Sequence, residues 1–383
     1  MIKIIKIILV LILTLFVSSQ KVFSDDKIKI GLLVPLSGEN AEIGQSIIKA
    51  TRLAINKINN PLIEIIPKDT ESSPNTTLQK SKEFNDLGVK VVIGPVFNEN
   101  LNYLDEINNI TFLSLTNKII DNPKNVISAG INATSQLETI KKFIDLNGIK
   151  KTIFLIPDTH YKKEVDKGIS NSKIKIFKKH IYSSEPTKLT KQIEKITNYK
   201  VRKQNLEDEV VRLEKLDQSN KGRLIEKLKM RDTLGSVKFD SLIIADFDES
   251  LKSVTTSLLY TDISPKNKYF ITLNQWFDES LLKETSSQPI YFPSINKENY
   301  EIFSKEYFEN FKQYPNQLSF LSYDLIGLVY YLIAQNDLIV DEKIFKKETL
   351  FKGKIGVFKI KNYKINHVLN FYKVTNNEFK KVF

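Results

Sequence analysis

The chain has 383 residues, a net charge of +12 and no cysteine. The lack of cysteine excludes disulfide bonds, thiol chemistry, thiolate metal sites and a lipid-modified N-terminal cysteine. Only five of the 57 basic residues are arginine, the side chain best suited to phosphate, and the lysines are scattered. We therefore expect a protein of two domains that does not bind nucleic acid.

The first 24 residues predict a cleaved export signal. Lys3 and Lys6 precede an almost wholly apolar run, Ile7–Val17, and Val22–Ser24 offers the small or medium side chains that a signal peptidase reads. A transmembrane anchor is the alternative interpretation, but it needs about 20 apolar residues, and this run is shorter. We expect cleavage after Ser24, a periplasmic protein, and no stable membrane insertion afterwards.

The segment that follows the leader predicts a buried strand, a tight turn and an amphipathic helix. Residues 30–34 are apolar or glycine throughout, and Pro35–Gly38 forms the turn. Apolar side chains then recur at positions 43, 47, 50, 54 and 58, which is the spacing of one helix face. Such a strand is typical of a parallel sheet covered on both faces, and open α/β sheets bind ligands at the carboxyl ends of their strands.

The rhythm of strand and helix continues in two successive series. The first is expected to contain strands at residues 62–67, 89–93 and 111–115 and helices at 76–87 and 98–107. The second is expected to contain helices at 136–146, 161–170 and 189–197, a further helix that ends near Tyr260, and strands at 151–156, 174–182, 241–245 and 269–273. This alternation indicates βαβ units and a parallel sheet in each of two similar lobes.

The C-terminal part is expected to cross between the lobes. Residues 290–292 are extended, 300–314 and 317–334 are helical, and 354–360 pairs with 367–374. The helix at 317–334 is apolar nearly all round and is therefore expected to be buried. We assign residues 27–130 and 294–345 to the first lobe, and residues 131–293 and 346–383 to the second.

Residues 203–231 interrupt the rhythm and predict a helical hairpin inserted into the second lobe. Its two apolar stripes are formed by Leu206, Val210, Leu213 and Leu216 and by Leu224, Ile225 and Leu228, and charged side chains crowd the other faces. Two interpretations are open: a docking arm for a protein partner, or a hairpin that packs its apolar stripe against the lobe. We favour the second, because amphipathic helices mostly face a core.

Five segments follow one another in a characteristic order. They are GLLVPLSGENAEIGQSIIKATRLAINKI (31–58), VVIGPVFNENL (91–101), FLIPDTHYKKEV (154–165), LSYDLIGLVYYLI (321–333) and FKGKIGVFKI (351–360). Together they resemble the leucine-binding branch of the periplasmic binding proteins. The resemblance implies a type I periplasmic binding protein fold, which is an α/β fold with two Rossmann-like lobes joined by a three-segment hinge. It also implies that a small ligand in the cleft draws the lobes together by a hinge motion.

The same resemblance implies which residues line the cleft. By position they are Ser37, Asn98, Ser114, Thr116, Tyr161, Phe247 and Asn274, with Trp276 nearby. Amino-acid binders of the family hold the ligand carboxylate with hydroxyls and its ammonium with an acidic side chain. Asn98 and Asn274 depart from that pattern. A buried ammonium without a carboxylate would lose charge-assisted hydrogen bonds worth about 1.5–3 kcal/mol each.

Two functions follow from the resemblance. The first is capture of a small polar, amino-acid-like ligand for an inner-membrane ABC permease. The alternative is a narrower branch, indicated by the hairpin and by Asp232–Gly235 after it. That branch resembles penicillin-binding protein activators, which regulate peptidoglycan synthesis by contact with a penicillin-binding protein.

The sequence does not indicate an enzyme, a metal site or a cofactor. Ser46–Lys49 fits the SxxK pattern of penicillin-recognising serine enzymes, but no SDN or KTG element accompanies it. Asp246, Asp248 and Glu249 could hold a cation, although acids in the first turn of a helix have a commoner cause in the helix dipole. His160 either lines the cleft or lies in a solvated loop. We therefore expect a binding protein with no catalytic residues.

Overall fold

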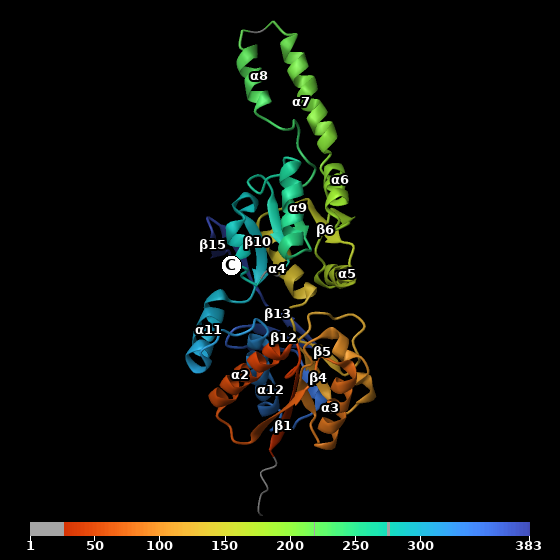
Figure 1. The fold of residues 1–383 in the computed structure, drawn as a ribbon, viewed down its shortest axis with the longest axis vertical. Helices are drawn as coiled ribbons and strands as arrows, with labels where there is room; N and C mark the ends of the chain where they lie inside the picture. Colours follow the sequence, from red (N-terminus) through yellow and green to blue (C-terminus); the bar gives the residue numbers. More distant parts are fainter. Residues whose placement is uncertain (1–26, 218, 274–275) are drawn as a thin grey trace, which may run out of the picture.

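The computed structural model describes residues 27–217, 219–273 and 276–383, and it places them in two lobes stacked end to end with a helical arm beyond the second lobe (Figure 1). The export leader lies outside the described residues. Each lobe is centred on its own sheet. The α/β class and the two-lobe layout predicted from the sequence are confirmed.

The first lobe is built on a parallel five-stranded sheet in the order β2-β1-β3-β4-β5. Its strands are β1 (Ile28–Val34), β2 (Ile63–Asp69), β3 (Val91–Ile93), β4 (Thr111–Ser114) and β5 (Val126–Ser128). They are connected by α2 (Ala41–Ile58), α3 (Pro74–Asp86) and two 3-10 turns, η1 (Asn98–Leu101) and η2 (Leu104–Glu106). The single helix expected at 98–107 is wrong, because Tyr103 between the two turns has a left-handed backbone with φ of 71°.

Both faces of this sheet are covered, which explains why successive positions of β1 are apolar. Leu32 packs with residues of α2 and of α12 (Ser319–Ala334), whereas the next residue, Leu33, packs with residues of α3, η1 and η2. Neither side chain is more than 1% exposed. The first polar residue after the strand is Ser37, which is exposed in the turn at the edge of the sheet.

The second lobe contains a seven-stranded sheet in the order β15-β14-β10-β9-β8-β6-β7. The parallel strands are β6 (Thr152–Pro157), β7 (Lys178–Tyr182), β8 (Ser241–Ile244), β9 (Tyr269–Thr272) and β10 (Ile290–Ser294), and the antiparallel ones are β14 (Asn370–Thr375) and β15 (Glu378–Lys381). Helices α4 (Ala133–Leu146) and α5 (Tyr161–Ser172) cover one face, and α6 (Pro186–Ile196) and α9 (Asp248–Tyr260) cover the other. The short α10 (Ser280–Lys283) and η3 (Thr285–Ser287) precede β10.

Two helices return to the first lobe after β10. Both α11 (Lys297–Phe311) and α12 contact α2. At this contact Ser46 Oγ lies 2.7 Å from Ser319 Oγ and 3.1 Å from Tyr307 Oη. The hydroxyl of the SxxK pattern therefore takes part in packing three helices together.

The assignment of residues 346–383 to the second lobe is wrong for its first half. After η4 (Glu342–Phe345), strands β11 (Thr349–Lys352), β12 (Val357–Lys361) and β13 (Lys364–His367) form a separate antiparallel sheet. Its apolar side chains join the core of the first lobe. The expected pair 354–360 with 367–374 is also wrong, because β12 pairs with β11 and β13, whereas β14 pairs with β10 and β15.

A buried carboxylate explains why this small sheet lies on the first lobe. Asp324 on α12 is 1% exposed and accepts the backbone N–H groups of Lys354, Ile355 and Gly356 at 2.9, 3.1 and 2.6 Å. A side chain on Gly353 would collide with this carboxylate, since its Cβ would lie 2.5 Å from Asp324 Cγ. The turn between β11 and β12 is therefore fixed to α12.

The chain crosses between the lobes three times: after β5, after β10 and after β13. The first and third crossings are hydrogen-bonded to each other. Asn132 Nδ2 donates to Ile365 O at 3.2 Å, and the backbone N–H of His367 donates to Ser135 Oγ at 2.9 Å. The second crossing is tied to the strand after the third, because the N–H of Lys297 donates to Tyr372 Oη at 2.9 Å. These three segments form the hinge.

His367 is a neutral group buried within this hinge. It is 2% exposed, and its Nε2 lies 2.7 Å from the carbonyl oxygen of Ala129, which can only accept, so Nε2 carries the proton. Burial lowers the pKa of His367 to about 4, although the bond to Ala129 acts in the opposite direction. The hinge therefore contains a side chain that resists protonation.

The hairpin predicted at 203–231 exists, but its favoured interpretation is wrong. Helices α7 (Tyr199–Glu214) and α8 (Lys221–Lys229) project away from the second lobe as an arm (Figure 1). No residue of α8 is buried, and in α7 only Arg202 and Leu213 are. The apolar stripes pack on each other within the hairpin, since α7 and α8 contact one another and neither joins a core cluster of the lobe. The arm projects from the end of the molecule that is farthest from β1 (Figure 1).

One arginine anchors the arm. Arg202 is 6% exposed and donates to Thr261 O at 3.0 Å, to Gly235 O at 3.4 Å and to Thr233 Oγ1 at 2.5 Å. Its guanidinium also lies 3.4 Å from the carboxylate of Asp262. The start of α7, the return segment of the hairpin and the end of α9 are thus joined at one point.

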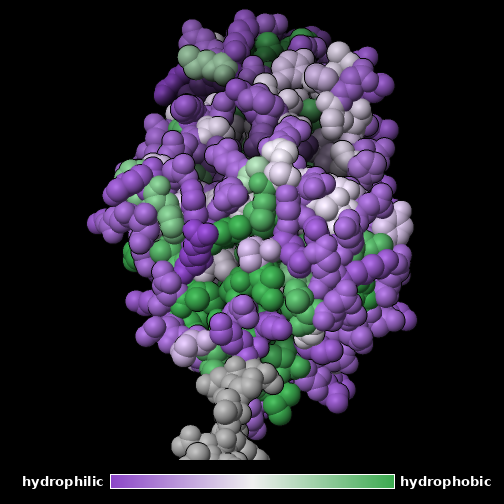
Figure 2. Space-filling model, turned by 60° about the horizontal axis from the view of Figure 1, so that its bottom comes forward, coloured by the Kyte–Doolittle hydropathy of each residue, from purple (hydrophilic) through white to green (hydrophobic). Residues whose placement is uncertain are grey.

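On the face of the first-lobe end, hydrophilic side chains predominate around the periphery and hydrophobic ones gather in the middle (Figure 2). Within the described residues, no helix combines the length and hydropathy that a bilayer crossing needs.

Replacing Arg202 with alanine is expected to lower the free energy of unfolding by about 2 kcal/mol or more, because buried carbonyl acceptors lose a charged donor. Amide hydrogen exchange at residues 233–235 should accelerate at the same time. Arg212→Ala is the matched control, since Arg212 lies on the same helix, is exposed and pairs with Glu209 on the surface. Equal destabilisation by the two variants in thermal or urea unfolding would contradict this account.

His367 is expected to make stability depend on pH between about 4 and 6.5. Its folded pKa is lowered, so the unfolded chain binds a proton first as the pH falls, and the contribution of His367 to stability decreases through this window. The difference corresponds to roughly 3 kcal/mol. Burial raises the pKa of Asp324 to about 6, and this carboxyl changes stability in the opposite direction. His367→Gln keeps an N–H donor but does not titrate, so the urea-unfolding free energy of the wild type relative to that of this variant should fall as the pH is lowered through the window. His160→Gln, at an exposed histidine, should retain the wild-type slope.

Candidate functional site

The carboxyl ends of strands from the two lobes meet at one place. The loop after β4 belongs to the first lobe, and α5 follows β6 in the second. Glu164 on α5 accepts the backbone N–H groups of Ile119 and Ile120 at 3.0 and 3.1 Å. This carboxylate is 5% exposed. A buried acid therefore joins the lobes directly beside the predicted cleft.

The turn after β1 is held by Asp69 at the end of β2. Asp69 Oδ1 accepts the N–H of Leu36 at 2.7 Å and that of Glu71 at 2.8 Å, and the hydroxyl of Ser37 also bonds to this carboxylate. Burial alone would raise the pKa of Asp69, but these hydrogen bonds lower it below its usual value. Ser37 is exposed, and its hydroxyl is already engaged within the turn.

Gly44 makes the close approach of this turn to α2 possible. A Cβ at this position would lie 1.6 Å from Pro35 O.

Ser114 and Thr116 lie together at the end of β4, as the sequence predicted. Ser114 Oγ donates to Pro95 O at 2.9 Å and accepts the N–H of Thr116 at 3.3 Å. Thr116 Oγ1 accepts the N–H of Lys118 at 3.3 Å. Both side chains are buried, at 0% and 8% exposure. These hydroxyls therefore shape the loop after β4, and a ligand would have to compete with protein atoms for them.

Tyr161 and Phe247 are brought together from the second lobe. Their ring centroids are 5.9 Å apart, with Tyr161 at the start of α5 and Phe247 capping α9. Tyr161 Oη is buried without a hydrogen-bond partner among the described residues. Burial, and secondarily Glu164, raise the pKa of Tyr161 above its usual value. The phenol thus remains a protonated donor that a ligand oxygen or a water molecule could satisfy.

Trp276 lies at another junction between the lobes. Its ring is 5.4 Å from that of Phe320 on α12, in an edge-to-face arrangement. The tryptophan follows β9 of the second lobe, so this is a contact across the lobes. Asn274 lies outside the described residues.

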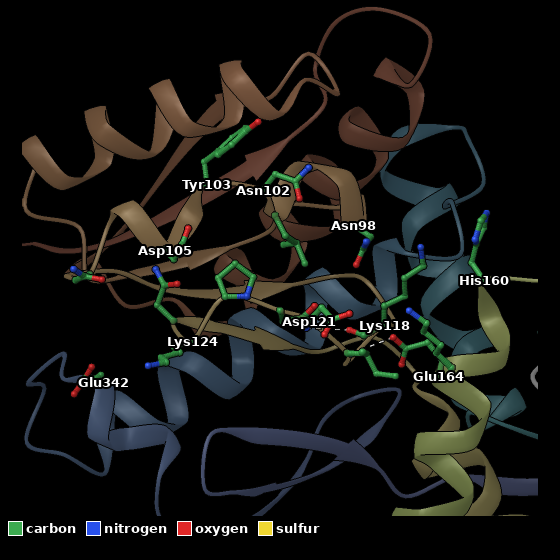
Figure 3. A pocket seen from close by; sticks show the side chains of 17 residues that line it. Asn98, Asn102, Tyr103, Asp105, Lys118, Asp121, Lys124, His160, Glu164 and Glu342 are labelled. Carbon is green, nitrogen blue, oxygen red and sulfur yellow. Dashed lines mark hydrogen bonds between the residues drawn. The ribbon is translucent and has the colours of Figure 1, made fainter.

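A cavity of about 930 Å³ opens at the lobe junction (Figure 3). It is bounded by η1 and η2, by the loop after β4 and by the start of α5. Asn98, Lys118, His160 and Glu164 gather at one end, whereas Asp105, Lys124 and Glu342 lie toward the other (Figure 3). Of the predicted site residues Asn98 lines this cavity, and Ser37, Ser114, Thr116, Tyr161, Phe247 and Trp276 do not.

Cations from both lobes line the cavity. Lys118 comes from the first lobe and Lys163 from the second, and no ion pair within the described residues joins either to an acid. Sequence reasoning missed both lysines and Glu164. Lysine is so frequent in this chain that no local pattern distinguishes these two. Glu164 is buried by the loop after β4, which lies more than 40 residues away in the sequence.

Three acids after β8, Asp246, Asp248 and Glu249, could hold a cation according to the sequence. Within the described part of the chain they do not form a group that could hold a metal ion. Tyr182 Oη donates to Asp246 Oδ2 at 2.6 Å, and the N–H of Phe247 donates to Oδ1 at 3.1 Å. Burial raises the pKa of Asp246 despite these bonds. Asp248 and Glu249 occupy the first turn of α9, where the helix dipole favours acids.

Glu164→Ala is expected to widen the distribution of distances between the lobes, because two amides lose their charged acceptor. Spin labels on Glu39→Cys and Lys167→Cys can report this distance without background, since the chain has no cysteine. Glu279→Ala, at an exposed acid, should leave the distribution unchanged. An unchanged distribution in the Glu164 variant would mean that this contact does not restrain the lobes.

Comparisons with known proteins agree with this architecture. Residues 27–177 match the family model described as periplasmic binding protein. No curated protein matches the chain. Among solved structures, the C-domain of LpoA from Haemophilus influenzae, titled a regulator of PBP1A, is 16% identical with a TM-score of 0.61, over 93% of this chain and 100% of that domain. The chain spans 59% of full-length LpoA.

Solute-binding proteins have the same fold. Leucine binding protein LivK from Thermotoga maritima is 15% identical with a TM-score of 0.53, over 92% of this chain and 97% of that one. A solute-binding protein of an ABC transporter from Rhodopseudomonas palustris, in complex with 3,4-dihydroxybenzoic acid, is 17% identical with a TM-score of 0.53, over 91% and 92% of the two chains. The resemblance seen in the sequence is confirmed: the chain has the type I periplasmic binding protein fold, and its residues 27–177 carry the family's sequence pattern.

Proposed function

We propose that this is a periplasmic solute-binding protein that captures a small polar ligand at the lobe junction and delivers it to an inner-membrane ABC permease. The observation that carries the proposal is the cavity of about 930 Å³ whose polar lining comes from both lobes. A ligand that touches Lys118 and Lys163 at once stabilises one orientation of the lobes over others. A hinge protein closes on its ligand only if the ligand makes more favourable contacts in the closed orientation than in the open one.

The lining favours a ligand that carries a carboxylate or another anionic acceptor. Lys118, Lys124 and Lys163 supply positive charge, and His160 and Asn98 supply polar groups. The hydroxyls of Ser114 and Thr116 are bonded internally. An amino-acid-like ligand would therefore be held mainly by lysine and amide groups.

One observation favours the alternative, a regulator of peptidoglycan synthesis that contacts a penicillin-binding protein. Beyond its anchor at Arg202 the arm formed by α7 and α8 does not join the core of the lobe, and Met230, which follows α8 on the return side of the hairpin, is 88% exposed. The C-domain of LpoA, a regulator of PBP1A by its title, shares the fold. An exposed arm on a protein of this fold supports a role in protein contact.

A thermal-shift screen with amino acids, short peptides, aromatic carboxylates and muropeptides tests the proposal. A solute ligand at 100 times its Kd stabilises the folded state by about 2.7 kcal/mol, which should raise the Tm of a chain of this length by roughly 3–4 °C. Lys118→Ala should reduce this shift, whereas Lys90→Ala, at an exposed lysine of the same lobe, should not.

Deleting residues 203–231 separates the two functions. A solute binder should keep its ligand-induced shift after the deletion. A regulator should show no shift with any compound, should bind a purified penicillin-binding protein, and should lose that binding when the arm is removed.

A further inference from the structure

The edge strand of the second sheet is open on one side. Strand β7 ends the strand order and pairs only with β6 among the described residues. Phe177 just before it is 53% exposed, and Ile181 within it is 48% exposed. Exposed apolar side chains along an unpaired strand are uncommon, because such an edge can pair with another chain.

A groove of about 680 Å³ runs beside this edge, between β7, α6 and the segment at residues 238–239. Its apolar lining includes Ile153 on β6, Ile196 on α6 and Phe239 before β8. Phe177 and Ile181 also border it. The groove therefore offers apolar contacts alongside free backbone groups of an edge strand.

Positive charge from three separate segments borders the groove. Lys178 comes from β7, Lys195 from α6 and Lys238 from the segment before β8, and no ion pair within the described residues neutralises them. No acidic residue lines the groove, in contrast to the cavity at the lobe junction, which has four. Burial, with the charge of Lys178, lowers the pKa of His180, so the positive charge comes from the lysines.

The lysines around the groove are only partly explained by protection of the edge strand against aggregation. Lysine on an edge strand discourages unwanted pairing, which suits Lys178 and its neighbour Lys179. Lys179 is paired with Asp166 on α5, over the opposite face of the sheet. Protection does not require lysines from α6 and from the segment before β8 to converge on the same apolar groove.

We propose that this groove binds an extended segment of a partner protein in which acidic and apolar side chains alternate. The segment adds a strand to β7 through main-chain hydrogen bonds, its apolar side chains lie against Phe239 and Ile196, and its acidic groups face the three lysines. The site is distinct from the lobe junction, and its test is independent of any ligand bound there.

Fluorescence anisotropy with a labelled peptide that alternates glutamate and valine tests this proposal on the full mature chain. The peptide should bind, and raising the salt from 50 to 500 mM should weaken it, because exposed charges are screened. Lys178→Glu combined with Lys195→Glu should weaken binding at least tenfold. Lys283→Glu, at an exposed lysine elsewhere in the second lobe, should have no effect, and a lysine–valine peptide should not bind. Hydrogen exchange should slow at residues 178–182 when the acidic peptide is present.

Three outcomes would overturn the proposal: no binding of the acidic peptide, equal weakening by Lys283→Glu, or binding of the lysine–valine peptide with similar affinity. A dimer that forms in solution and is dissociated by Phe177→Ser would identify a second copy of this chain as the occupant and would also overturn it.

Discussion

The three crossings between the lobes are the constraint on which the rest of the structure depends. Because the chain passes from one lobe to the other three times, neither lobe can separate from the other, and their relative motion is confined to bending at these segments. The crossings are bonded to each other through Asn132, Ser135 and His367. Buried hydrogen bonds of this kind are costly to leave unmade. They hold the three crossings together as one unit.

The two-sided burial of each sheet determines where chemistry is possible. Strands β1 and β6 contribute mainly apolar side chains to the interior, apart from Thr152, whose hydroxyl bonds to that of Ser241, and polar groups collect in the turns at their ends. At these ends the turns must also satisfy their own backbone. Asp69 and Ser114 do so with side chains that would otherwise be available to a ligand. The same polar atoms are therefore needed both to hold the turns in place and to bind a ligand. The lysines of the junction cavity are not used to hold the turns.

Strands and helices that show a local apolar periodicity could be predicted from the sequence. The placement of an element could not be predicted where it depends on contacts between residues far apart in the chain. The apolar runs at β1, β6 and β8, and the helix at 317–334, are visible because burial on all sides leaves a continuous apolar pattern. Nothing local distinguishes β12 from β14, although one belongs to the first-lobe core and the other to the second sheet. The small sheet that contains β12 is fixed to the first lobe by Asp324. This residue is 30 residues or more along the chain from the amides that donate hydrogen bonds to it. The hairpin stripes were recognised correctly, but their periodicity could not say whether they face the lobe or each other. The roles of Glu164 and Arg202 depend in the same way on residues far along the chain.

The arm and the lobe junction are connected by a single helix. Phe247 at the start of α9 packs on Tyr161 beside the junction, and Thr261 and Asp262 at its end hold Arg202. A helix of this length spans about 20 Å and does not bend easily. The arm is therefore carried rigidly by the second lobe, and its direction relative to the first lobe changes with every rotation at the hinge. A ligand that selects one orientation of the lobes also selects one orientation of the arm, so binding at the junction and protein contact at the arm need not be separate functions.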